Sequence, residues 1–157
     1  MPERVLKARA EETSASIDEE LVADLVETMR ASPACVGLAA PQVGVSKRVI
    51  AVDVTGHPKT TVCHGLLVLA DPVVVDSSGR EVGREGCMSV PDLTANVARA
   101  KRVAISGTLP DGSSTVIVTE GFEARAFQHE VDHLDGLLIL DRVASLSTDV
   151  FRRKTYK

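Results

Sequence analysis

The chain has 157 residues, which is the size of one domain and enough to bury a core without disulfide bonds. Its formal charge of -4 argues against a protein that binds nucleic acid by neutralising phosphates. No apolar run approaches the roughly 20 residues of a membrane span, and the first residues lack the apolar centre of a signal peptide. We therefore expect a soluble, cytoplasmic protein with one domain over residues 1–157.

The first expected element is an amphipathic helix at about residues 17–31. An apolar residue recurs every four positions from Ile17 to Met29, which is the stripe of a helix that packs on a core. Ser16 and Glu19 have the spacing of a capping box at its start. The residues before it, 1–16, form an N-terminal extension.

The middle of the chain has the pattern of strands. Four short segments rich in Val and Ile are separated by Gly, Pro, Asp and Ser: KRVIAVDV (47–54), GLLVLADPVVV (65–75), KRVAISGTL (101–109) and STVIVTE (114–120). Hairpin-length connections between strands, with a helix on either side, favour an α+β domain with mostly antiparallel sheets.

A second helix is expected over GFEARAFQHEVDHL (121–134), and Gly136 is placed to end it. The C-terminal tail comprises residues 144–157, and its part STDVFRRKTYK (147–157) is expected to form a short helix capped by Ser147 or Thr148.

The second helix carries the motif HEVDH (129–133). At about 100° per residue, His129 and His133 lie roughly 40° apart on the helix, so both imidazoles can point at one metal ion. Glu130 falls on the flank of the same face, where a base for a metal-bound water is needed. The alternative is a solvated helix face, but the neighbouring residues are largely apolar.

A catalytic ion usually has three protein ligands and one water, so a third ligand must come from elsewhere. His57, His64, Cys87 and several carboxylates are candidates. Cys87 lies in REGCMSVPD (84–92), where Gly and Pro indicate an irregular backbone rather than the inside of a strand. The alternative for Cys87 is a buried small apolar residue. Cys63 and His64 are neighbours near a strand, so their side chains should point to opposite faces.

The segment GLAAPQVG (37–44) has small side chains that let a substrate or another backbone approach closely. Gln42 is its one strongly polar side chain, and the amide can donate a hydrogen bond to a developing oxyanion. The alternative is that Gln42 bridges local backbone groups.

Together the three motifs resemble the peptide deformylase family. That family has a G-x-G-x-A-A-x-Q segment, an E-G-C-x-S segment and an H-E-x-x-H helix in this order, which correspond here to CVGLAAPQ (35–42), EGCMS (85–89) and HEVDH (129–133). The resemblance covers roughly residues 17–143. It implies an α+β fold with mostly antiparallel sheets around a central metal-binding helix.

The resemblance also implies an activity. The enzyme would hydrolyse the N-formyl group from the N-terminal methionine of nascent polypeptides and release formate. Cys87, His129 and His133 would bind ferrous iron, with zinc or nickel able to substitute, although these ligands suit zinc equally. The ion would activate a water for attack on the formyl carbon. Gln42 and the backbone N–H of Met88 would help the ion to hold the oxyanion, and Glu130 would carry the proton to the leaving amine.

Further roles follow from the same resemblance. Glu85 and Arg99 would orient a ligand histidine, with a surface salt bridge as the alternative. The peptide would add as a strand, and the residues expected to line its groove and the methionine pocket are Val36, Gly37, Leu38, Met88, Phe122, Ala126 and the stem of Arg125. Nascent formylmethionyl peptides are the expected partners of a monomer, and the basic end FRRKTYK (151–157) is a candidate ribosome contact.

The sequence departs from the family pattern at Cys35, which replaces the first glycine of its motif, and in a short N-terminal segment. If Cys35 needed a positive φ, the cost would be of order 1 kcal/mol. These departures leave two alternatives open. One is a hydrolase of the same fold that acts on another formamide or amide, and the other is a peptide-binding homologue that has lost catalysis.

Overall fold

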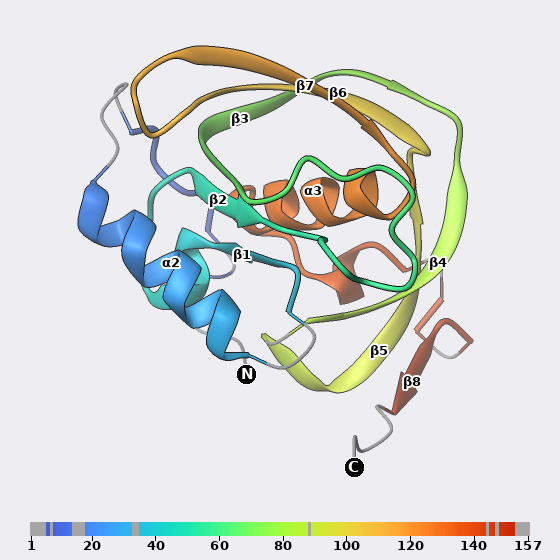
Figure 1. Ribbon diagram of the computed structural model, residues 1–157. Helices are drawn as coiled ribbons and strands as arrows, with labels where there is room; N and C mark the ends of the chain where they lie inside the picture. Colours follow the sequence, from blue (N-terminus) through green and yellow to red (C-terminus); the bar gives the residue numbers. More distant parts are fainter. Residues whose placement is uncertain are drawn as a thin grey trace.

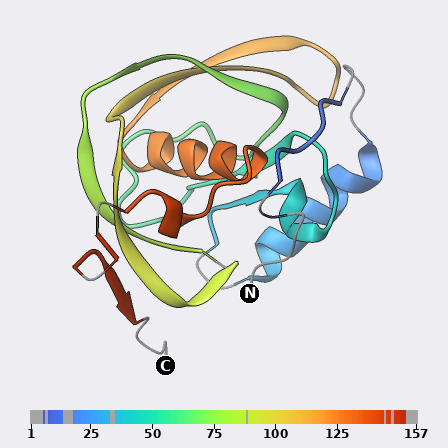
Figure 2. The ribbon, with the colours of Figure 1, turned by 180° about the vertical axis from the view of Figure 1, so that it is seen from behind.

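Helix α3 (Gly121–Leu134) occupies the middle of the fold, with strands around it and helix α2 (Glu19–Ala31) on the outside (Figures 1 and 2). The computed structural model describes residues 6, 8–13, 18–32, 35–87, 89–143, 145–146 and 148–152. None of the helices in these ranges is long and apolar enough to cross a membrane.

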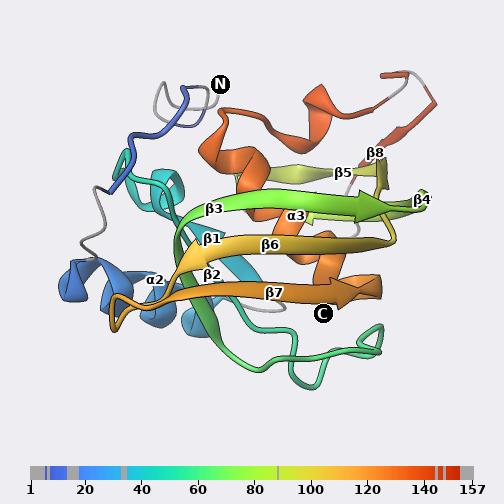
Figure 3. The same ribbon diagram turned by 90° about the horizontal axis from the view of Figure 1, so that it is seen from above.

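Two antiparallel sheets surround α3. The five-stranded sheet has the order β1-β2-β3-β6-β7 and contains Gly37–Ala39, Val49–Val52, Leu67–Ser78, Arg102–Thr108 and Ser114–Glu120. The three-stranded sheet has the order β4-β5-β8 and contains Glu81–Cys87, Val90–Arg99 and Val150–Arg152. In Figure 3, β3, β6 and β7 lie side by side across α3. The predicted α+β class is confirmed.

The two predicted helices are present because each buries an apolar stripe. In α2 the buried residues are Leu21, Leu25 and Met29, which pack against β1 and β2. In α3, Phe127 and Leu134 are fully buried in the central core. The positive φ of Gly136, 76°, lies just beyond the end of α3, as predicted.

The start of α2 and the C-terminal segment differ from the prediction. The N-cap of α2 is Asp18, whose side chain accepts a hydrogen bond from the backbone N–H of Glu20, so the capping box at Ser16 was wrong. Ser16 itself lies outside the described residues. In place of a C-terminal helix, Val150–Arg152 forms β8, because the edge of β5 offers hydrogen bonds to it at Leu93–Ala95.

Two strands, β1 and β4, end near the point where the three motifs come together. β1 and β4 are terminal strands of their respective sheets. β1 begins at Gly37 and is followed by the 3-10 helix η1 (Ala40–Val43), which carries Gln42. β4 ends at Cys87, where the pairing with β5 shifts in register after Gly86. The fold therefore places two free strand edges near α3.

Candidate metal centre

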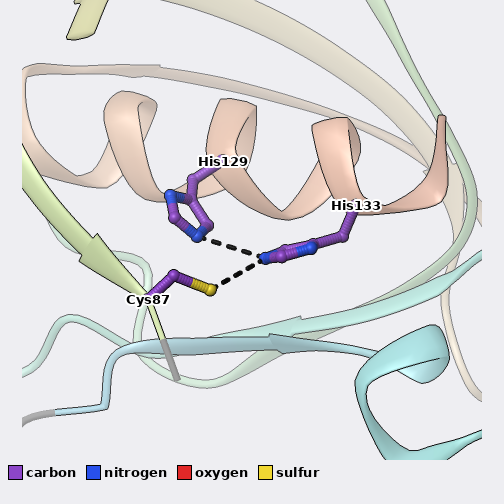
Figure 4. Close-up of side chains that lie close together, drawn as sticks. All are labelled: Cys87, His129 and His133. Atoms are coloured by element: carbon purple, nitrogen blue, oxygen red, sulfur yellow. Dashed lines mark hydrogen bonds between the residues drawn. The ribbon is translucent and has the colours of Figure 1, made fainter. Parts of the chain in front are cut away.

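Cys87, His129 and His133 converge beside α3 (Figure 4). The Cys87 Sγ lies 3.2 Å from His133 Nε2, which lies 3.3 Å from His129 Nε2. The two histidines are one helical turn apart, and the cysteine reaches them from the register shift at the end of β4. Cys87 thus lies at an irregular position, as expected, although it is the last residue of a strand.

The surroundings prepare these side chains to bind a cation. Burial, followed by the nearby charge of His129, lowers the pKa of His133 to about 3, so its imidazole is neutral at neutral pH and has a lone pair to donate. Burial alone would lower the pKa of His129. Its hydrogen bonds to Cys87 and Glu85 instead raise that pKa well above the usual value. The thiol and the carboxylate thus stabilise a positive charge on the His129 ring, and a bound metal ion could supply that charge in place of the proton.

The donor set fits a metal ion. One thiol and two imidazole nitrogens, with their ligand atoms within 4.8 Å of one another, are a common combination for zinc and iron. Glu130 Oε1 next to them is buried and lacks a hydrogen-bond partner among the described residues. A buried carboxylate oxygen without a partner is costly unless a ligand or water satisfies it.

Glu130 is held against β1. It is only 4% exposed, and burial is the main reason why its pKa rises to about 7. A Cβ atom at Gly37 would lie 2.6 Å from Glu130 Oε2, so this glycine makes room for the carboxylate. A carboxyl group with such a pKa can both accept and release a proton near neutral pH.

Gln42 bridges a local backbone group, and its amide nitrogen faces the candidate metal ligands. Its Oε1 accepts a hydrogen bond of 2.9 Å from the backbone N–H of Ala39, which fixes the side chain locally. Its Nε2 then points to the site and lies 3.2 Å from Ser89 Oγ and 3.6 Å from Cys87 Sγ. The amide N–H groups therefore lie beside the candidate metal ligand Cys87.

Comparison with known proteins shows the family of the chain. A model of the family described as polypeptide deformylase matches residues 1–149. The chain belongs to this family. Its members remove the N-formyl group from nascent peptides, and the chain is an enzyme of this class.

Individual deformylases are similar over most of their length. The peptide deformylase of Thermodesulfovibrio yellowstonii is 40% identical over 98% of this chain and 92% of its own. That of Halothermothrix orenii is 45% identical over 83% and 80%. The crystal structure of the Ehrlichia chaffeensis peptide deformylase superimposes with a TM-score of 0.85 at 32% identity and covers 94% of this chain and 87% of its own. The Synechococcus elongatus enzyme, solved in complex with actinonin, has a TM-score of 0.80 at 36% identity and covers 92% and 76%.

Behind the three candidate ligands of this deformylase lies a buried ion network. Glu85 Oε1 accepts a hydrogen bond of 2.9 Å from His129 Nδ1. Arg99 donates to both oxygens of Glu85 and also to Asp132, which in turn accepts two hydrogen bonds from Arg142. The Arg99 and Glu85 side chains are 3% and 6% exposed, so the reading of these residues as a surface salt bridge was wrong.

Asp132 and Arg142 were missed from the sequence. Asp132 lies between the two histidines of HEVDH, and an acidic residue beside two metal ligands on a buried helix was a signal for a buried partner. Its partners come from β5 and from the segment after α3, and no spacing in the sequence relates these positions.

The residues expected to line the peptide groove have diverse surroundings. Leu38 is 1% exposed, and its side chain packs with the apolar residues of α2. Phe122 is stacked on His57, with ring centroids 4.1 Å apart. Gly37 faces Glu130, and Ala126 is buried in the central core. Met88 lies outside the described residues, and Val36 is partly buried against that core.

The other thiol and imidazole groups of this deformylase do not join the three candidate ligands. His57 is half-buried and stacks on Phe122. His64 donates its backbone N–H to Glu123, 2.7 Å away, and its ring contacts the same carboxylate. Cys63 and His64 lie in the loop that leads into β3.

Cys35 is accommodated without backbone strain. Among the described residues other than glycine, only Asp71 has a positive φ, so the cost considered for Cys35 does not arise. The Cys35 thiol donates to the carbonyl oxygen of Gly37 at 3.1 Å, and burial raises its pKa. This deformylase thus carries an extra, partly buried thiol in the loop before β1.

Proposed function

We propose that this enzyme deformylates the N-terminal methionine of nascent chains with a metal ion held by Cys87, His129 and His133, and with Glu130 as the proton carrier. The convergence of three ligand atoms beside a buried carboxylate whose Oε1 has no described hydrogen-bond partner is the observation that carries the assignment. The whole chain, residues 1–157, would act as one catalytic domain.

We propose ferrous iron as the native ion, with zinc or nickel able to substitute. When bound, the ion supplies a Lewis acid that makes water nucleophilic and polarises the formyl oxygen. The preference for iron rests on the family resemblance, since a thiolate and two imidazoles also suit zinc.

Glu130 would move the proton. Its carboxylate lies beside the ligands and has an oxygen free of described partners, so it can accept a proton from the attacking water. Its raised pKa, about 7, allows the same group to give that proton to the leaving amine. The Gln42 Nε2 group and the backbone N–H of Met88 would donate hydrogen bonds to the oxyanion.

The substrate would bind as an added strand. β1 and β4 each have one edge that is not paired within their sheets. β4 ends at the candidate ligand Cys87, and β1 begins at Gly37, beside Glu130. A formylated peptide could pair with these edges through its backbone, and its methionine side chain would then contact Val36, Phe122 and Ala126.

The test is formate release from formyl-Met-Ala-Ser by iron-loaded protein under oxygen-free conditions. We expect turnover by the parent and a loss of at least about 100-fold in Glu130→Gln. A folded, metal-loaded parent that releases no formate would overturn the proposal. Because Cys35 alters the loop before β1, a panel of other formamides is included, and a clear preference for one without methionine would favour the alternative hydrolase.

We also propose that the enzyme works as a monomer in the cytoplasm and that its basic tail contacts the ribosome. The tail proposal rests on the charge of FRRKTYK (151–157). Deleting residues 153–157 removes three basic residues and leaves β8 in place. Cosedimentation with ribosomes should weaken in this variant, and unchanged binding would remove the idea. Light scattering of the purified protein tests the monomer.

A further inference from the structure

The stem of Arg125 was expected to line the peptide groove, and its guanidinium is directed to Glu85. Its NH1 donates to Glu85 Oε2 at 2.5 Å and to the carbonyl oxygen of Val97 at 2.9 Å. Its NH2 donates to the carbonyl oxygen of Glu81 at 2.8 Å. The side chain is 13% exposed. Arg125 therefore joins α3 to both β4 and β5.

Gly83 makes room for this arrangement. A Cβ atom at position 83 would lie 3.0 Å from Arg125 Cζ and 3.2 Å from its Nε and NH2 atoms. These distances are tighter than an ordinary carbon contact, so a methyl group here would require the guanidinium, which is fixed by three hydrogen bonds, to move by a few tenths of an ångström. The glycine in β4 and the arginine in α3 are thus a matched pair.

Glu85 is held from two sides. Arg99 of β5 donates from Nε to Oε2 at 3.0 Å and from NH2 to Oε1 at 2.9 Å. Arg125 of α3 holds Oε2 from the other side, and Oε1 accepts the hydrogen bond from His129 Nδ1. With either arginine removed, the carboxylate could rotate, and the direction in which His129 presents Nε2 would be less well defined.

We propose that Arg125 is a positioning residue for the metal centre: through Glu85 it fixes the imidazole of His129, and it depends on Gly83 to do so. This inference rests on the proposed function, because it concerns the same site. It assigns Arg125 a role behind the metal ligand in place of a contact with the substrate.

The test compares Arg125→Ala, Arg125→Lys and Gly83→Ala with the parent. The first readout is the rate at which zinc-loaded protein releases its ion to a chromophoric chelator, and the second is the separation of kcat and KM for formyl-Met-Ala-Ser. Arg84→Ala is the matched control. Arg84 also lies in β4, but it contacts Asn96 and the ring of Phe151 rather than Glu85.

We expect Arg125→Ala to release zinc about 10- to 100-fold faster and to lower kcat by about 10-fold with KM changed less than about twofold. Arg125→Lys should fall between, because an ammonium cannot make the forked contacts. Gly83→Ala should resemble Arg125→Ala, and adding it to Arg125→Ala should have little further effect.

Two results would overturn the inference. A higher KM with unchanged kcat and zinc release would make Arg125 a substrate contact. A lower melting temperature without faster zinc release in either Arg125→Ala or Gly83→Ala would make the pair merely structural. Zinc release requires no turnover, and the parent's formate release is measured in parallel. Formate release by the parent therefore tests the deformylase proposal, and zinc release by the variants tests the role of Arg125 independently.

Discussion

The backbone of Gly37 lies so close to Glu130 that a methyl group on the glycine would come within 2.6 Å of Oε2 and 2.9 Å of Cγ. The two residues belong to different motifs, 93 positions apart, and meet because β1 runs beside α3. The glycine is therefore required for the position of the carboxylate that we propose as the proton carrier.

We expect Gly37→Ala to displace Glu130. Turnover should fall by at least about 100-fold, as for loss of a general base, while zinc binding persists because no ligand is touched. Overpacking should also cost about 1 to 3 kcal/mol of stability. Gly107→Ala is the control, since its Cβ would lie 3.2 Å from Leu69 Cβ in the sheet. Equal losses of activity in the two variants would show that Gly37 acts through stability alone.

Metal removal should abolish activity. Substitutions can distinguish the residues that bind the ion from those that do not. Cys87→Ser and His133→Ala should each weaken zinc binding by more than about 100-fold. This loss is larger than the loss expected when a residue that only hydrogen-bonds to a ligand is replaced. Cys63→Ser should bind as the parent does, because Cys63 is an exposed thiol in a loop. Chelation followed by titration with a metal indicator measures these affinities. Retention of tight binding in Cys87→Ser would remove Cys87 from the ligand set.

Gln42 allows its two hydrogen-bonding roles to be tested apart. Gln42→Glu keeps an oxygen to accept from the Ala39 N–H but loses the amide donor that faces Cys87 and Ser89. If the amide stabilises an oxyanion, both Gln42→Glu and Gln42→Ala should lower kcat by about 100- to 1000-fold. If Gln42 only fixes the loop, Gln42→Glu should retain activity. Steady-state kinetics of the two variants distinguish these outcomes.

The sequence was sufficient for those parts of the fold that carry a periodic pattern. Both main helices and four strands were predicted, because their apolar residues follow the period of the element. β4 and β5 were not predicted. Their sequences, EVGREGC and VPDLTANVAR, contain glycine, proline and charged residues, and they become strands by pairing with each other.

The site shows the same difference between local pattern and tertiary structure. Residues within motifs could be predicted from the sequence, but the contacts that support them depend on how the chain folds. Arg125 illustrates the limit: its place one turn before His129 was compatible with the substrate groove, and only the position of β4 directs it to Glu85. The N-cap Asp18 is a similar case, because Ser16 and Asp18 are both good capping residues.

The raised pKa of Glu130 predicts how the stability of metal-stripped protein depends on pH. Burial raises this pKa from 4.5 in the unfolded chain to about 7 in the folded one. Between these values the folded state holds more protons than the unfolded state, so the free energy of unfolding falls as pH rises. Above pH 7 the free energy of unfolding is lower by about 3 kcal/mol than it is below pH 4.5, where Glu130 is protonated in both states.

Glu130→Gln should lack this loss, because the amide does not ionise. Urea unfolding of both proteins without metal, at pH 5 and pH 8, should show the parent losing stability relative to the variant as pH rises. Contributions that the two proteins share, such as the raised pKa of His129, cancel to the extent that the substitution leaves them unchanged. Parallel pH profiles would mean that folding does not raise the pKa of Glu130. This result would contradict the proposal that Glu130 both accepts and releases a proton near neutral pH.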